Sequence, residues 1–159
     1  MDIHTHMMEL ALDEARSAAQ RGEVPVGAVV YQPDGTVLAK AGNRVVEKAD
    51  PTAHAEVEAL RAACAALGRP RLDGCVIAVT LEPCAMCAQA IALARLQELR
   101  FGAHDVKSGG TLNGVRVFNN PACHHKPAVV DGQMAEESKQ LLQSFFKARR
   151  NKKDEVEKP

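Results

Sequence analysis

Two short motifs constrain this chain more than any other feature: His-Ala-Glu at residues 54–56 and Pro-Cys-Ala-Met-Cys at residues 83–87. Together they supply one imidazole, two thiols and one carboxylate. The imidazole and the thiols are typical zinc ligands, and the carboxylate need not be a ligand. Three protein ligands leave one coordination position open for water, which is the arrangement of catalytic rather than structural zinc sites.

The length and charge of the chain limit its organisation and its partners. We expect residues 1–159 to form one domain, with its core at about 7–150 and a charged, frayed tail at 151–159. The 20 basic and 20 acidic residues cancel. This balance excludes a global positive field, so any binding of nucleic acid must use a local patch.

The N-terminus and the cysteines favour a cytoplasmic location. Residues 1–6 lack the basic start and apolar run of a signal peptide, and no segment is long and apolar enough to span a membrane. In a reducing cytoplasm, five cysteines with two in one motif are better suited to metal binding than to disulfides.

The periodicity of apolar residues predicts alternating helices and strands. The expected helices are 7–21, 53–67, about 84–95 and 134–150, and the expected strands are 26–31, 36–41, 75–81, 98–103 and a short one at 129–130. A Pro-Asp-Gly turn at 33–35 joins the first two strands into a hairpin. Residues 104–126 are rich in Gly and Asn and show no clear pattern. This order predicts an α/β fold with helices on both faces of one sheet.

The spacing of the motif residues predicts zinc-activated water. His54 and Glu56 lie near the start of one expected helix, and Cys84 and Cys87 share one face of another. Free N–H groups and the helix dipole favour negative charge there, so both cysteines are expected to bind as thiolates. Zinc lowers the pKa of bound water from roughly 15.7 toward about 7, and Glu56 can carry protons to a ring nitrogen and the leaving amine. The indicated reaction is hydrolytic deamination of an amino-heterocycle.

A closed zinc site is the competing interpretation. A Cys-x-x-Cys pair by itself favours it, and Cys75 or Cys123 can act as a fourth ligand. The His-x-Glu partner and the proline before Cys84 favour the catalytic arrangement instead, because this combination is the known signature of zinc nucleobase deaminases. Other histidines, at 4, 6 and 124–125, lack the spacing of a complete second site.

From about residue 7 to 150 the chain resembles the bacterial tRNA-specific adenosine deaminases of the cytidine-deaminase-like superfamily. The zinc motif marks only the superfamily, and the flanking sequence selects this branch. The matching segments are Glu-Val-Pro-Val-Gly-Ala-Val at 23–29, Gly-Asn-Arg at 42–44, Asp-Pro-Thr-Ala-His-Ala-Glu at 50–56, Val-Thr-Leu-Glu-Pro-Cys-Ala-Met-Cys at 79–87, Phe-Gly-Ala-His-Asp-Val-Lys at 101–107 and Phe-Phe-Lys-Ala-Arg-Arg at 145–150.

The resemblance implies a homodimeric enzyme that converts the wobble adenosine of a tRNA anticodon stem-loop to inosine. It also implies a three-layer α/β/α cytidine-deaminase-like fold with a central mixed five-stranded sheet. By the same resemblance, His54, Cys84 and Cys87 hold Zn²⁺, Glu56 carries protons, and Asn43 hydrogen-bonds the target base. The other implied contacts are Ala55 through its backbone N–H, Val24, Pro25 and Leu81 around the base, and Asp105, Lys107, Phe146, Arg149 and Arg150 along the RNA.

The last expected helix offers a local basic strip. Six basic residues and no acidic one lie between Lys139 and Lys153, which suits phosphate binding but also a solvated helix face. By helical spacing, at least one of Phe145 and Phe146 faces the core, and the other can stack on RNA. Asn43 also fits the role of a turn residue. The pair at 105 and 107 also fits an exposed loop.

The segment after Lys107 departs from the family pattern. It reads Ser-Gly-Gly-Thr-Leu-Asn-Gly at 108–114, where the commoner bacterial loop has an Ala and then a Gly-Ser. We expect this loop to neighbour the substrate, so the alternative function is a zinc-dependent deaminase of a free base or nucleoside, of the guanine or cytosine type. A zinc-stabilised binding module without catalysis is a further alternative, which the presence of Glu56 disfavours.

Overall fold

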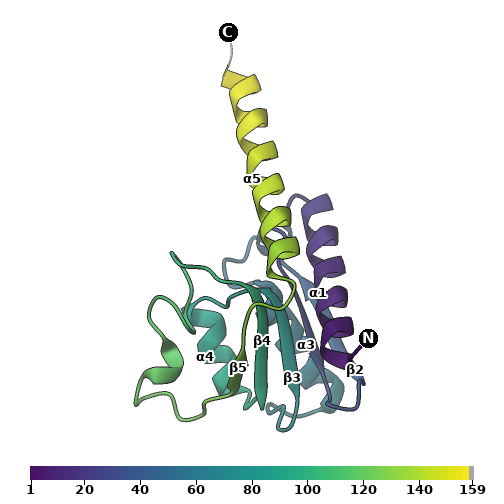
Figure 1. The fold of residues 1–159 in the computed structure, drawn as a ribbon, viewed down its shortest axis with the longest axis vertical. Coiled ribbons are helices and arrows are strands. Elements are labelled where there is room, and N and C mark those ends of the chain that lie inside the picture. The colour runs from purple at the N-terminus through teal and green to yellow at the C-terminus, as the bar shows by residue number, and fades with distance from the viewer. Residues whose placement is uncertain (158–159) are drawn as a thin grey trace.

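The computed structural model describes residues 1–157, which build one five-stranded sheet with helices on both faces (Figure 1). The elements in chain order are α1 (Ile3–Gln20), β1 (Gly27–Tyr31), β2 (Val37–Gly42), α2 (Val45–Lys48), α3 (Ala55–Leu67), β3 (Val76–Leu81), α4 (Ala85–Leu93), β4 (Glu98–Ala103), a 3₁₀ turn η1 (Val117–Asn119), β5 (Ala128–Val130) and α5 (Ala135–Glu157). No helix within this range is both long and apolar enough to cross a membrane.

The sheet is mixed, and its strand order is β2-β1-β3-β4-β5. Strand β1 is antiparallel to both β2 and β3, whereas β3, β4 and β5 are parallel. Parallel strands end at the same edge of a sheet. Leu81 and Ala103, the last residues of β3 and β4, are therefore paired there. As a result, the start of α4 and the segment after Ala103 leave the sheet side by side.

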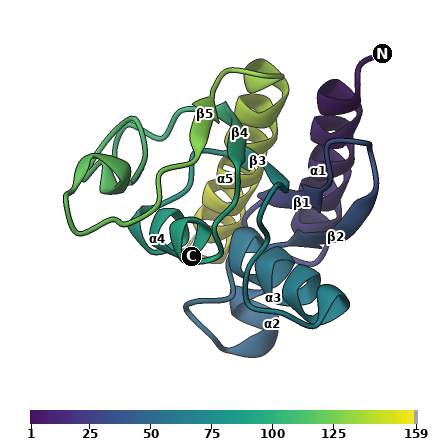
Figure 2. The same cartoon turned by 90° about the horizontal axis from the view of Figure 1, so that it is seen from below.

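Two separate cores make the fold three-layered. In β1, Ala28 and Val30 pack with the residues of α3 and α4, while Val29 and Tyr31 pack with α1. A strand buried on both faces alternates its side chains between two cores. Figure 2 shows α1 and α5 on one side of the sheet and α3 and α4 on the other. The expected α/β/α architecture with a mixed five-stranded sheet is confirmed.

The boundaries of α1 and α5 differ most from those expected, while α3 and α4 differ by one or two residues at their ends. Helix α1 begins at Ile3 rather than at residue 7, because the Asp2 carboxylate caps it by accepting a hydrogen bond from the Thr5 N–H at 2.7 Å. Helix α5 runs to Glu157, so the tail expected to be frayed is helical over 151–157. Residues 158–159 of that tail lie outside the described residues. The tail continues the helix because Lys, Arg and Glu are good helix formers.

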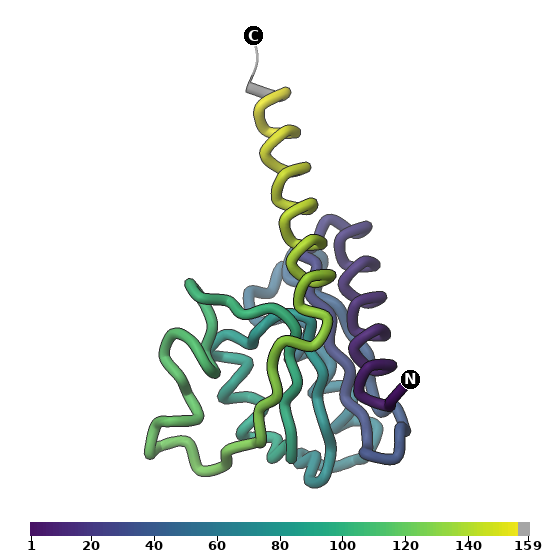
Figure 3. The backbone as a smooth tube through the Cα atoms, viewed as in Figure 1, coloured from purple at the N-terminus to yellow at the C-terminus, as the bar shows by residue number. Residues whose placement is uncertain are grey.

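Helix α5 extends well past the end of α1 and leaves the body of the molecule (Figures 1 and 3). Only its first part packs on the sheet. There the Ser138 hydroxyl donates to the carbonyl oxygen of Thr80 at 2.6 Å, and Leu142 packs against the core. The segment 104–127 has no regular structure except for η1. In Figure 3 it lies on the left side of the molecule, across the sheet from α1. The short helix α2 was not predicted.

Candidate active site

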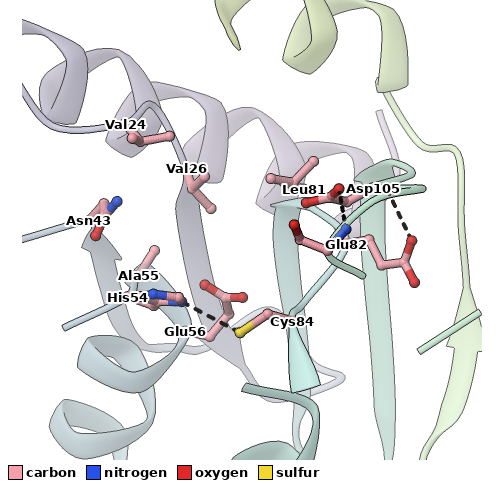
Figure 4. A pocket seen from close by; sticks show the side chains of 11 residues that line it. Val24, Val26, Asn43, His54, Ala55, Glu56, Leu81, Glu82, Cys84 and Asp105 are labelled. Atoms are coloured by element: carbon pink, nitrogen blue, oxygen red, sulfur yellow. Dashed lines mark hydrogen bonds between the residues drawn. The ribbon is translucent and has the colours of Figure 1, made fainter. Parts of the chain in front are cut away.

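The three motif ligands lie at the first residues of two helices. His54 is the N-cap of α3 and Cys84 is the N-cap of α4, and Cys87 follows in the first turn of α4. N-cap side chains usually bond to their own helix, which is why Ser, Thr, Asp and Asn prevail there. Neither His54 nor Cys84 does so. Instead the two side chains turn toward each other (Figure 4).

The positions of the ligand atoms fit a tetrahedral zinc ion. Nδ1 of His54 lies 3.6 Å from Sγ of Cys84 and 3.5 Å from Sγ of Cys87. Bond lengths of about 2.3 Å to sulfur and 2.0–2.1 Å to nitrogen, at tetrahedral angles, put a nitrogen and a sulfur about 3.6 Å apart. All three ligand atoms lie within 4.8 Å of one another. This His-Cys-Cys group can therefore hold a metal ion.

Neither candidate for a fourth ligand joins this group. The Sγ of Cys123 donates to the backbone carbonyl of His125 at 3.2 Å, and the Sγ of Cys75 points to that of Asp73 at 3.8 Å. Among the residues described, no second cluster of three metal-ligating side chains exists. Within residues 1–157 the site thus has three protein ligands, as a catalytic zinc site does.

Glu56 adds a buried carboxyl group beside the ligands. It lies in the first turn of α3, is 4 % exposed, and points into the space next to Cys84 (Figure 4). Burial raises the pKa of Glu56 above its ordinary value. A raised pKa makes the carboxylate a stronger base than one in water, which suits a group that accepts and returns a proton in general acid–base catalysis.

The pKa values of the two thiols are shifted in opposite directions. A hydrogen bond from Cys87 and another from His54 lower the pKa of Cys84 to about 4. The hydrogen bond between the two sulfurs and the burial of Cys87 raise the pKa of Cys87, and the bond to Cys84 raises the pKa of His54. A thiolate beside an imidazole is a good ligand pair for a soft divalent cation.

A cavity of about 240 Å³ opens next to these residues. Sites that enclose drug-sized ligands span roughly 300–1,000 Å³, so this one suits a smaller group, such as one heterocyclic base. Its walls come from the segment before β1, the ends of β2 and β3, the starts of α3 and α4, and the loop after β4. The lining residues are Val24, Val26, Asn43, His54, Ala55, Glu56, Leu81, Glu82, Cys84, Asp105 and Ser108.

The structure brings together most of the residues predicted for the base. Asn43, Val24, Ala55 and Leu81 line the cavity, whereas Pro25 is buried outside it. Asp105, which was predicted along the RNA, also lines the cavity. The side-chain oxygen of Asn43 is buried and has no hydrogen-bond partner within residues 1–157. A buried acceptor without a partner is costly in a folded protein, so this oxygen is available to a ligand in the cavity.

Apart from Asp105, the residues predicted along the RNA lie outside the cavity. Lys107 is exposed in the loop after β4, and Phe146, Arg149 and Arg150 lie on α5. Phe146 is 41 % exposed, and Phe145 is partly buried beneath the Arg149 guanidinium, 4.8 Å from the ring centre. The two rings also contact each other edge to face, with centres 5.4 Å apart, and Phe146 is the more exposed of the two.

Three lining residues were not predicted: Val26, Glu82 and Ser108. Glu82 follows β3 directly and is 2 % exposed. Burial acts to raise the pKa of Glu82, but hydrogen bonds from the Asn113 side chain and the Asp105 N–H outweigh it and lower the pKa to about 2. In the sequence, only its position between an apolar strand and a proline could have indicated that Glu82 is buried at the cavity. Ser108 lies in the segment without a pattern.

Comparisons with known proteins agree with this site. Residues 2–150 match the model of the MafB19-like deaminase family. The tRNA-specific adenosine deaminase of Agrobacterium fabrum (strain C58) is 53 % identical over 150 residues, which cover 94 % of this chain and 98 % of that protein. A structure from a study of A-to-I editing by tRNA:A34 deaminases is similar with a TM-score of 0.85 and 54 % identity, over 87 % of this chain and 99 % of that chain.

The Bacillus subtilis guanine deaminase structure is more distant. It has a TM-score of 0.64 and 31 % identity, over 95 % of each chain. Both solved structures have the fold of this chain. The identity is 54 % to the structure from the tRNA:A34 deaminase study and 31 % to the guanine deaminase, so the chain is more similar to the first. The chain belongs to the family of the tRNA-specific adenosine deaminases, within the cytidine-deaminase-like superfamily.

Proposed function

We propose that this protein is a zinc-dependent hydrolase that deaminates the wobble adenosine of a tRNA anticodon loop to inosine. The similarity to the Agrobacterium fabrum deaminase along 98 % of that protein's length carries the proposal. The cavity supports it, because it has room for one base beside the His-Cys-Cys group. A base can reach such a cavity only when it is turned out of a loop, as anticodon bases can be.

His54, Cys84 and Cys87 would hold the zinc ion, through Nδ1 and the two thiolates. When bound, Zn²⁺ would act as a Lewis acid that lowers the pKa of a water molecule. Because Cys84 and His54 are N-caps, their backbones are fixed by α3 and α4, which pack together and on the sheet. The ligands would thus be held in place before the substrate arrives.

Glu56 would move the protons of the reaction. Its carboxylate would accept a proton from the attacking water and deliver it to the adjacent ring nitrogen. After the water oxygen has bonded to C6, Glu56 would take the second proton from that hydroxyl and pass it to the amine at C6, so that the C–N bond breaks as the C–O bond becomes a carbonyl. Adenosine and water thereby give inosine and ammonia. Asn43 and the backbone N–H of Ala55 would hydrogen-bond the base and orient it toward Glu56, with Val24 and Leu81 against its faces.

The rest of the RNA would lie outside the cavity. Asp105 and Lys107 are placed on the loop at its edge. On α5, the exposed Phe146 could stack on a base, and Arg149 and Arg150 could bind phosphates. Arg149 also donates to the carbonyl oxygen of Gly22 at 3.3 Å. This contact joins the helix to the segment that precedes Val24 in the cavity wall.

The guanine-type free base is the second candidate substrate. The similarity to the Bacillus subtilis guanine deaminase over 95 % of each chain favours it, because the ligand set does not distinguish the two reactions. The identity of 31 % to that protein, against 53 % to the adenosine deaminase, places tRNA first.

The deciding experiment compares substrates on the purified, zinc-loaded protein. We expect inosine in an anticodon stem-loop that carries a wobble adenosine, and no comparable turnover of free guanine, cytosine or adenosine. A stem-loop with the same sequence but guanosine at the wobble position is the matched control. Rapid turnover of guanine with an unchanged stem-loop would refute the proposal in favour of the second candidate.

We further propose that the protein acts in the cytoplasm as a homodimer of single-domain subunits. An apolar groove between α3 and α4, with Leu93 63 % exposed, offers a surface for a second copy. Light scattering should give about twice the subunit mass of 17.1 kDa. A single mass near that of one subunit at micromolar concentration would contradict the dimer.

A further inference from the structure

The Glu82 carboxylate is the centre of a hydrogen-bond cluster that holds one wall of the cavity. Its Oε1 accepts from the Asp105 N–H at 3.0 Å and from the Asn113 side-chain amide at 2.6 Å. Its Oε2 accepts from the N–H groups of Thr111, Leu112 and Asn113 at 3.2, 3.0 and 3.0 Å, and from the Thr111 hydroxyl at 2.9 Å. Six donors thus converge on one carboxylate.

All six donors belong to the loop 105–113, which follows β4. This loop has no strand partner. Its other backbone N–H bonds go from Gly109 and Ser108 to Asp105 and from Gly110 to the carbonyl oxygen of Pro83 at 2.8 Å. The carbonyl oxygens of Gly110 and Asn113 accept from the N–H groups of Val117 and Arg116. A Cβ on Gly109 would lie 2.6 Å from the Glu82 carboxyl carbon, so the loop wraps closely around the charge. The Glu82 carboxylate therefore accepts backbone N–H bonds that a helix or strand partner would accept elsewhere.

The loop contributes directly to the cavity. Asp105 and Ser108 are lining residues, and Lys107 lies exposed between them. Figure 4 shows Glu82 next to Asp105, whose backbone N–H donates to the Glu82 carboxylate. The Glu82 side chain is buried, all its hydrogen bonds are to the loop, and Nδ1 of His104 lies 3.8 Å from its Oε1, so its carboxylate is not free to take part in proton transfer. Its effect on a substrate must pass through the loop.

We propose that Glu82 is a positioning residue that shapes the loop 105–113 into the substrate-facing wall and thereby sets the affinity for the RNA around the target base. The inference rests on the proposed function for the identity of the substrate. The role of Glu82 in folding the loop does not depend on that function. Because the loop carries neither the metal ligands nor Glu56, its disorder should weaken binding more than it slows chemistry. The expected signature is a change in KM rather than in kcat.

The test compares Glu82→Gln with Thr111→Val and Asn113→Ala. A glutamine keeps the size of the side chain but turns an NH₂ group toward N–H donors, so the cluster cannot reform. We expect Glu82→Gln to raise the KM for the anticodon stem-loop by about tenfold or more, the loss expected for one hydrogen bond to a charged group, with kcat changed less than about threefold. The two loop variants each remove one cluster bond and should shift KM less. They keep the inference testable if Glu82→Gln does not fold.

A second readout follows the loop without any substrate. Lys107 and Arg116 are exposed trypsin sites on this segment. Trypsin should cut folded Glu82→Gln at these positions faster than it cuts the native protein. Unchanged trypsin cleavage, an unchanged KM, or a fall in kcat and zinc content at constant KM would each overturn the inference. If the native protein deaminates free guanine instead of the stem-loop, the proposed function fails, and the same KM comparison is then made with guanine.

Discussion

Replacement of Gly110 by alanine should disturb the metal ligands through the backbone alone. A Cβ at this position would lie 2.5 Å from the Ala85 nitrogen and 2.6 Å from the Cys84 carbonyl carbon. Ordinary contacts begin at 3.4 Å, so the loop and the start of α4 must separate by about 0.9 Å. Neither side can yield by a side-chain rotation, because all the atoms in contact are backbone atoms. Either the N-cap residue Cys84 must therefore move, or the loop around Gly110 must move away from Cys84.

Both energetic and catalytic losses follow from this displacement. Overpacking of this kind costs roughly 1–3 kcal/mol. In a chain of this size that lowers Tm by roughly 2–12 °C. A misplacement of about 1 Å near the reacting groups can cost on the order of 10² in rate. We expect Gly110→Ala to fold, to lose about 100-fold in kcat/KM on the stem-loop, and to bind less zinc. The assays are inosine formation at a temperature well below Tm and metal analysis of the purified variant.

Gly68→Ala is the matched control. Gly68 has φ +66 at the end of α3, and an added Cβ there meets no atom within 4 Å. Only the left-handed backbone is strained, at a cost of about 1–2 kcal/mol. The control should therefore lose similar stability but keep its activity and its zinc. If Gly110→Ala keeps activity and zinc as Gly68→Ala does, the added Cβ does not displace Cys84, and the reasoning is refuted.

Three further predictions follow from the site and its supports. Glu56→Gln should keep its zinc and its Tm but lose roughly 10²–10⁴ in kcat, and substantial remaining activity would show that Glu56 is not the proton carrier. Removal of zinc by a chelator should abolish deamination and lower Tm in calorimetry, and added Zn²⁺ should restore both; activity that survives full chelation would argue against a metal enzyme. The third concerns Glu82, whose folded-state pKa of about 2 lies below the ordinary 4.5. A lowered pKa stabilises the fold above the ordinary value, and this stability, about 3 kcal/mol, should be lost as the pH falls from 4.5 toward 2. Urea unfolding at several pH values would measure the free energy of unfolding. In Glu82→Gln this free energy should fall less between pH 4.5 and 2 than in the native protein.

The layered fold and the ligand set were predictable because their signals are local. Apolar strands such as 26–31 must be buried on both faces, which requires helices on each side. Cys84 and Cys87 are three residues apart on one helix, so their spacing alone places both thiols on one face. His54 and Glu56 likewise belong to a single turn at the start of α3. None of these features depends on a distant part of the chain.

The supports of the cavity were missed because their partners are distant in sequence. Glu23 is buried and accepts hydrogen bonds from the N–H groups of Val46 and Glu47, at the start of a helix of four residues that has no strong pattern of its own. Glu82 bonds to residues 23 to 31 positions further along the chain. A buried carboxylate is stable only when several hydrogen-bond donors surround it. A local sequence pattern does not show which distant residues will provide those donors.

The sequence by itself determined the chemistry: three ligands and a carboxylate at helix starts indicate zinc-activated water wherever the rest of the chain lies. Only the tertiary structure decided what surrounds that chemistry. The parallel pairing of β3 and β4 brings the segment 104–116 beside the start of α4, and the Glu82 carboxylate then folds it into a wall. A ligand motif specifies the reaction through the electronic properties of its own atoms, whereas a cavity exists only where separate segments of the chain meet.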